Sequence, residues 1–97
     1  MKILILGDVH GAWSYLIDAV KWAKSQGCER VLQVGDFGYS ELKDIPKFGK
    51  LLPTYFVDGN HENFVNLYKD RAGKEGIVEL RKNLFHISRG HAERWGN

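Results

Sequence analysis

Residues 3–10 read ILILGDVH, a short aliphatic run that is closed by glycine and aspartate. A continuous apolar run bounded by turn residues is typical of a strand that is buried on both faces of a parallel sheet. Beyond it, apolar residues recur at steps of three and four, which predicts a helix of about 13 residues that begins near Trp13 and ends near Gly27. A strand followed by a helix is the opening unit of an α/β fold.

Two later segments repeat the pattern of a strand followed by a polar loop. Residues 30–36 read RVLQVGD, and residues 54–62 read TYFVDGNHE. The interval at residues 37–53 contains two prolines and two glycines, so we predict a loop there, with at most a short helix around residues 42–51. A second short helix is expected at residues 63–68.

The last part of the chain predicts two further strands. Residues 77–80 read IVEL and residues 84–87 read LFHI, which indicates either a hairpin or two edge strands. No repeat, linker or low-complexity segment is visible, so residues 1–97 are expected to form a single domain. The predicted class is α/β, with parallel strands and helices on the faces of the sheet.

Composition and charge exclude several classes of protein. With 43% hydrophobic and 27% charged residues, the 97-residue chain has an ordinary globular composition. The formal net charge is +2 and no block of five like charges occurs, so nucleic acid is expected only as a substrate. The first apolar run is too short for a signal peptide or a membrane span. Cys28 is the only cysteine, which rules out an internal disulfide and fits a cytoplasmic protein.

Five polar residues come shortly after the predicted strands: Asp8, His10, Asp36, Asn60 and His61. In open α/β sheets, parallel strands present their carboxyl ends at one edge, and ligands bind at that edge. These residues are therefore expected to converge in space, although more than fifty positions separate the first from the last.

The types of these residues point to divalent metal ions. Carboxylate, imidazole and amide oxygen together suit Mn, Fe, Zn or Mg, whereas a soft-metal site would need thiolates. The two-residue offset lets Asp8 and His10 reach one ion. The Asp36 carboxylate can bridge two ions, and Asn60 supplies a neutral oxygen. Two ions about 3.5 to 4 Å apart can acidify a bridging water and orient it for attack on phosphorus. His61 is then placed to protonate the leaving alkoxide.

The blocks GDVHG at residues 7–11, GD at residues 35–36 and GNHE at residues 59–62 resemble motifs of a known family. They are similar to the first three motifs of the calcineurin-like metallophosphoesterases, which run D-x-H, GD and GNH[DE]. The segment NLFHISRG at residues 83–90 also looks like phage and bacterial members. The resemblance covers nearly all of the chain. It implies the N-terminal portion of an α/β sandwich and metal-dependent hydrolysis of phosphomonoesters or phosphodiesters.

The resemblance also implies a role for each residue. Asp8 and His10 would bind the first of two divalent ions, and Asp36 would bridge the pair. Asn60 would bind the second ion. Asp36 and His61 would carry the catalytic step, with His61 as the catalytic histidine. Manganese is the metal expected first, with iron, zinc and magnesium as alternatives, and the implied partner is a phosphate-ester substrate.

The chain departs from the family pattern in its last part. The family continues with an isolated histidine and a terminal GHxH, whereas residues 90–93 read GHAE and lie only about 30 residues after Asn60. We interpret that match as chance, so the chain is expected to cover only the first part of the family's domain. Two alternatives stay open. One is a catalytically incomplete metal-binding or regulatory module, and the other is a half-domain that forms a homodimer through an exposed sheet edge.

Turn chemistry is the competing interpretation of the polar residues, because Asp, Asn and Gly all favour tight loops after strands. In that case His61 would be a structural cap. Three residues outside the motifs also receive structural interpretations. His86, in an apolar strand, is expected to be a packed or surface-facing histidine rather than a metal ligand. Arg71 is expected in a solvated loop, and Trp95 is expected to be exposed and to mark a contact surface.

Overall fold

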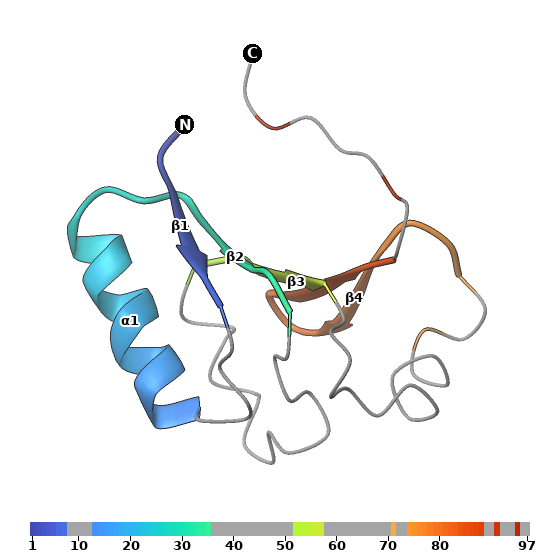
Figure 1. Ribbon diagram of the computed structural model, residues 1–97, viewed down its shortest axis with the longest axis horizontal. Coiled ribbons are helices and arrows are strands. Elements are labelled where there is room, and N and C mark those ends of the chain that lie inside the picture. The colour runs from blue at the N-terminus through green and yellow to red at the C-terminus, as the bar shows by residue number, and fades with distance from the viewer. Residues whose placement is uncertain are drawn as a thin grey trace.

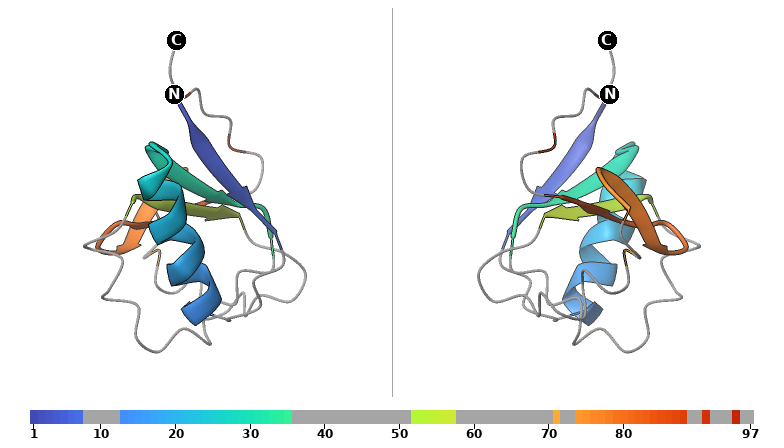
Figure 2. Two further views of the ribbon diagram at one scale, coloured as in Figure 1. Left: turned by 90° about the vertical axis from the view of Figure 1, so that its left-hand side faces the viewer. Right: turned by 90° about the vertical axis from the view of Figure 1, so that its right-hand side faces the viewer.

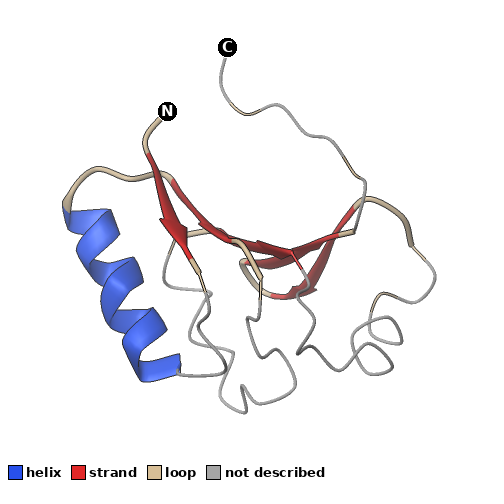
Figure 3. Ribbon diagram, in the orientation of Figure 1, coloured by secondary structure: helices blue, strands red, loops and turns tan. Residues whose placement is uncertain are grey.

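One mixed sheet organises the described part of the chain (Figure 1, Figure 3). The computed structural model describes residues 1–7, 13–35, 52–57, 71, 74–88, 91 and 95. Five strands and one helix lie within these residues: β1 (Ile3–Leu6), α1 (Trp13–Ser25), β2 (Arg30–Gln33), β3 (Thr54–Val57), β4 (Ile77–Arg81) and β5 (Leu84–Ile87). The strands follow the order β1-β2-β3-β5-β4 across the sheet.

Four of these strands run parallel to one another. β2 pairs with β1 and β3, and β5 pairs with β3, all in parallel register. β4 runs antiparallel to β5 and is an outer strand of the described sheet. The predicted α/β class is confirmed, and the five predicted strands are observed. Of the two arrangements expected for the last two strands, the hairpin is the one that forms, and β5 lies inside the sheet.

The turn of the β4–β5 hairpin depends on Asn83. Its φ of 64° lies in the left-handed region, which asparagine tolerates better than most residues. The Asn83 N–H donates to the Glu79 carboxylate at 3.1 Å, and the Asn83 C=O accepts from the Thr54 N–H at 2.9 Å. The same residue therefore closes the hairpin and joins it to the start of β3.

Helix α1 ends in a Schellman motif at Gly27. The N–H of Cys28 donates to the C=O of Ala23 at 3.0 Å, and the N–H of Gly27 donates to the C=O of Lys24 at 3.1 Å. Gly27 has a φ of 82°, which glycine adopts without steric cost. The predicted end of the helix near Gly27 is confirmed. The other two predicted helices, around residues 42–51 and at residues 63–68, lie outside the described residues.

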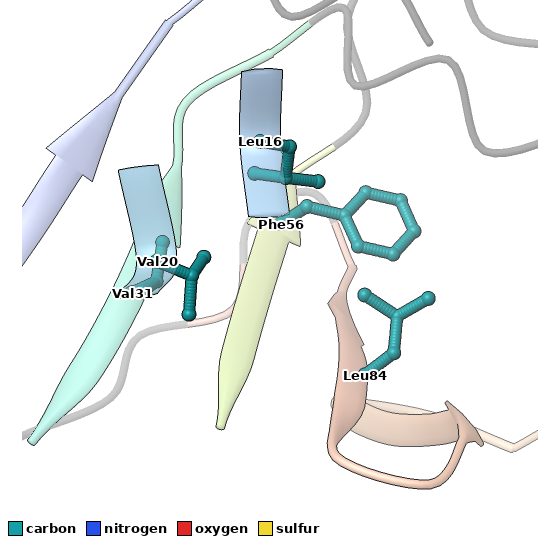
Figure 4. Close-up of a cluster of buried hydrophobic side chains, with 5 residues drawn as sticks. All are labelled: Leu16, Val20, Val31, Phe56 and Leu84. Carbon is teal, nitrogen blue, oxygen red and sulfur yellow. The ribbon is translucent and has the colours of Figure 1, made fainter. Parts of the chain in front are cut away.

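The main core lies between α1 and one face of the sheet (Figure 2). Figure 4 shows five fully buried side chains from α1, β2, β3 and β5 that form it: Leu16, Val20, Val31, Phe56 and Leu84. The helical spacing of the apolar residues in α1 directs one stripe toward the sheet. Each buried side chain of this kind contributes roughly 1.5 to 3 kcal/mol through removal from water.

The opposite face of the sheet is covered only in part. Ile5 is 63% exposed there, whereas Tyr55 has two aromatic partners. Its ring stacks on Phe85 and contacts Trp95, with both pairs of ring centroids 4.6 Å apart. The Arg30 guanidinium lies 4.9 Å from the centroid of the Trp95 ring, a cation–π distance. The expectation that Trp95 is exposed is therefore wrong, because its ring is half-buried between these groups.

Candidate functional site

Four parallel strands end together at one side of the sheet (Figure 1). The register pairs Gln33 with Leu6 and Phe56, and it pairs Phe56 with His86. β1 and β2 end at this level, and β3 and β5 continue for one residue more. We call this side of the sheet, where the strands end at Leu6, Gln33, Val57 and Ile87, the carboxyl edge. In α/β sheets this is the edge at which ligands bind.

The five residues predicted for the site lie outside the described residues: Asp8, His10, Asp36, Asn60 and His61. Their convergence therefore stays a prediction. The structure does bring together the strands that precede them. Gly7 and Gly35 are the last described residues after β1 and β2, and Val57 is the last described residue of β3. In the sequence, Asp8 and Asp36 are the next residues after these two glycines.

The pairing of β1 with β2 continues past the ends of both strands. The Val34 N–H donates to the Leu6 C=O at 2.8 Å. A Cβ added at Gly7 would lie 3.7 Å from Cγ2 of Val34, which is ordinary van der Waals contact. The backbone segments that lead toward Asp8 and Asp36 are therefore adjacent at Gly7 and Val34.

Gln33 holds the backbone at the end of β2. Its side chain is fully buried, and the Gly35 N–H donates to its Oε1 at 3.0 Å. The Gln33 Nε2 donates in turn to the Gly35 C=O. Gly35 itself is buried and has a φ of 121°, in the region that favours glycine. We call this arrangement of Gln33 and Gly35 the amide clamp.

The sequence interpretation missed the amide clamp, although a signal was present. Side chains alternate between the two faces of a strand, so Gln33 shares a face with Val31. Val31 lies in the middle of the aliphatic run and is fully buried. A polar residue at a core-facing position needs a hydrogen-bonding partner. Its place two residues before Gly35 made a local partner in the turn the simplest answer.

A second buried polar group lies beside the end of β5. Arg71 is only 2% exposed, and its Nη1 lies 2.9 Å from His86 Nδ1 and 3.2 Å from the His86 C=O. The Arg71 Nη2 donates to the C=O groups of Lys74 and Gly76, each at 2.9 Å. The expectation that Arg71 belongs to a solvated loop is wrong. Its guanidinium instead holds the segment before β4 against β5.

The same contacts define the state of His86. A guanidinium has no acceptor, so Nδ1 of His86 must accept and the proton of the neutral ring lies on Nε2. The ring is fully buried and lies 4.9 Å from the Phe56 ring, centroid to centroid. The interpretation of His86 as a packed histidine is confirmed.

Among the described residues, no group of three or more His, Cys, Asp or Glu side chains could hold a metal ion. The one cysteine, Cys28, is buried next to the start of β2, at the end opposite the carboxyl edge. The residues predicted for the site carry carboxylate, imidazole and amide groups. Their chemistry fits Mn, Fe, Zn or Mg and does not fit a thiolate-bound metal.

A pocket of about 220 Å³ opens on the face of the sheet away from α1, and it is lined by Leu32, Val57, Ile87, His91 and Trp95. Four of these five side chains are apolar, and none carries the fixed charge that would pair with a phosphate group. This pocket therefore does not have the lining of a phosphoryl-transfer site. Within the described part of the chain, no helix has the length and apolar character needed to span a membrane.

Comparison with known protein families gives the class to which these features belong. The family model described as calcineurin-like phosphoesterase matches residues 1–93 of the 97-residue chain. The chain belongs to this family, as its three motifs predicted. Family membership assigns it a general phosphoesterase function, which is a form of hydrolase activity. No curated protein and no solved structure matched the chain.

Proposed function

We propose that the protein is a metal-dependent phosphoesterase that cleaves phosphomonoesters or phosphodiesters at the carboxyl edge. The observation that carries this proposal is the common end of β1, β2 and β3, because the predicted ligands follow within four residues in the chain. Gly7 lies beside Val34, and in the sequence Asp8 is the next residue after Gly7 and Asp36 the second after Val34. Membership of a phosphoesterase family supports the proposed cleavage of phosphate esters.

The proposed ligands divide the work according to their chemistry. Asp8 and His10 would hold one ion, and the Asp36 carboxylate, with its two oxygens, would be shared with a second ion. Asn60 would bind the second ion through a neutral oxygen, which would offset less positive charge than a carboxylate would. The two ions, when bound, supply Lewis acidity and a water of lowered pKa. Manganese is the proposed metal, with iron, zinc and magnesium as alternatives.

His61 is the proposed general acid. It follows the proposed ligand Asn60 directly in the chain. An imidazolium at this place would donate a proton to the leaving alkoxide oxygen, which avoids the expulsion of a strong base. Phosphoproteins, nucleotides and nucleic acids all carry the ester that this chemistry cleaves. The proposed location is the cytoplasm, on the grounds of the single cysteine.

Two substitutions test the proposed function. With Mn²⁺ present, the parent protein is expected to hydrolyse a generic aryl phosphate, with a colour change that can be followed continuously. Asp36→Asn and His61→Ala are each expected to lower turnover at least about a hundredfold, because they remove a bridging ligand and a proton donor. Asp18→Asn is the matched control, since Asp18 is exposed on α1, and it should leave turnover unchanged.

These experiments distinguish a metal-dependent phosphoesterase from a metal-binding or regulatory module without turnover. Parental turnover in both Asp36→Asn and His61→Ala would reject the assigned site. Binding of Mn²⁺ without turnover of either a phosphomonoester or a phosphodiester would favour a metal-binding or regulatory module.

A further inference from the structure

Gln33 is a polar side chain in an otherwise apolar part of the core. It is fully buried, and its neighbours across the sheet, Leu6 and Phe56, have no hydrogen-bonding side chains. A primary amide in such surroundings is costly unless both its oxygen and its nitrogen are paired. In the amide clamp both atoms are paired with a single residue, Gly35. An apolar residue of similar size would fill the same space without this requirement.

The amide clamp fixes more than Gly35. The Gly35 N–H belongs to the peptide unit between Val34 and Gly35, and the Gly35 C=O belongs to the unit between Gly35 and Asp36. Each peptide unit is planar, so a hydrogen bond to its C=O also orients the N–H at its other end. Gln33 therefore holds the peptide unit from which the Asp36 residue continues. The Val34 N–H bond to the Leu6 C=O holds the same turn from the side of β1.

We propose that Gln33 is a positioning residue for Asp36, and that its amide clamp fixes the peptide unit between Gly35 and Asp36 before any divalent ion binds. The inference rests on the proposed function, because it takes Asp36 as a metal ligand. An amide is the side chain that suits this task. It donates and accepts at once, whereas an ionised carboxylate in its place could not donate to the Gly35 C=O and would add a negative charge near Asp36.

Replacement of Gln33 would lower only the stability of the fold if its role were purely structural. It would also lower the metal affinity if Gln33 were a positioning residue. Groups that hydrogen-bond to metal ligands or orient them typically change metal affinity about 10- to 100-fold when they are replaced. A structural residue changes the stability of the fold alone. Thr54 provides the comparison, because it is also fully buried and its hydroxyl donates to the Leu52 C=O at 3.1 Å. Thr54 begins β3, at the end of the strand away from the carboxyl edge.

The test compares Gln33→Met with Thr54→Val in the same protein. Titration calorimetry with Mn²⁺ measures affinity, and urea unfolding of the metal-free protein measures stability. Both variants are expected to unfold at lower urea, because each loses a buried hydrogen bond. The Mn²⁺ dissociation constant of Gln33→Met is expected to rise about 10- to 100-fold, whereas that of Thr54→Val should stay at the parental value.

A second measurement uses the parent protein alone. Amide hydrogen exchange of Gly35, followed by NMR, should show protection before any divalent ion is added, because the amide clamp is expected to exist in the metal-free protein. Protection that develops only after diamagnetic Mg²⁺ is added would contradict a preset geometry. This exchange measurement tests the preset geometry even if Gln33→Met does not fold, because it uses only the parent protein.

The remaining outcomes are distinguishable from failure of the proposed function. If the parent binds Mn²⁺ and Gln33→Met binds it equally well, the positioning role is overturned and the proposed function stands. If the parent binds no Mn²⁺, the proposed function fails and the inference fails with it.

Discussion

At the scale of single residues, two buried polar side chains organise the backbone near the carboxyl edge. Gln33 holds the turn after β2, and Arg71 holds the segment before β4 against the end of β5. Neither was predicted, for the same physical reason. The partners of these side chains are mainly backbone groups, so the sequence does not identify them, although the core-facing position of Gln33 did indicate that its amide needs a partner. His86 was correctly interpreted because its neighbours Phe85 and Ile87 indicated an apolar strand.

Arg71→Met tests the importance of the buried guanidinium. The substitution keeps a long side chain but removes the donors to His86, Lys74 and Gly76. Because buried acceptors without partners are costly, we expect the free energy of unfolding to fall by about 2 to 4 kcal/mol. Urea unfolding followed by circular dichroism measures this change.

Lys74→Met is the control for this substitution, since the Lys74 side chain is exposed and its C=O is retained. It should change the free energy of unfolding by less than about 0.5 kcal/mol. Equal stability of the two variants would show that the Arg71 hydrogen bonds contribute nothing net.

At the scale of secondary structure, the local sequence pattern was sufficient to predict whether each element is a strand or a helix. It was not sufficient to predict which strands lie next to one another in the sheet. The aliphatic run of residues 3–6 and the apolar spacing in α1 specify a strand and a helix by themselves. The place of β5 between β3 and β4 was not predicted, because the alternation of LFHI indicates a strand and says nothing about its partners. The order of strands is set by long-range packing, here of Leu84 beside Phe56 and α1.

Gly27→Ala tests the end of α1. At a φ of 82° alanine adopts a left-handed conformation, so we expect a loss of about 1 to 2 kcal/mol in the free energy of unfolding. An added Cβ would meet no atom within 4 Å, so the loss would come from the backbone and not from a clash. Thermal unfolding measured by calorimetry checks the value.

Gln26→Ala is the matched control at the neighbouring exposed position, with an expected change below about 0.5 kcal/mol. If Gly27→Ala were as stable as the parent, the Schellman motif would not be a significant contributor to the helix.

At the scale of the whole molecule, one sheet with a helix on one face carries the predicted site at its edge. The motifs predicted the family correctly, because their residue types and their positions after strands are both local properties. The geometry of the metal ligands stays a prediction, since Asp8, Asp36 and Asn60 lie outside the described residues. β1 and β4 are the outer strands of the described sheet. A homodimer of the kind considered from the sequence would add a strand at one of them.

The most direct test of the central claim is anomalous X-ray scattering from crystals grown with Mn²⁺. Two manganese peaks are predicted beyond the ends of β1, β2 and β3, about 3.5 to 4 Å apart and with the Asp36 carboxylate between them. Peaks elsewhere on the molecule, or none within ligand distance of Asp8 and Asp36, would contradict the account.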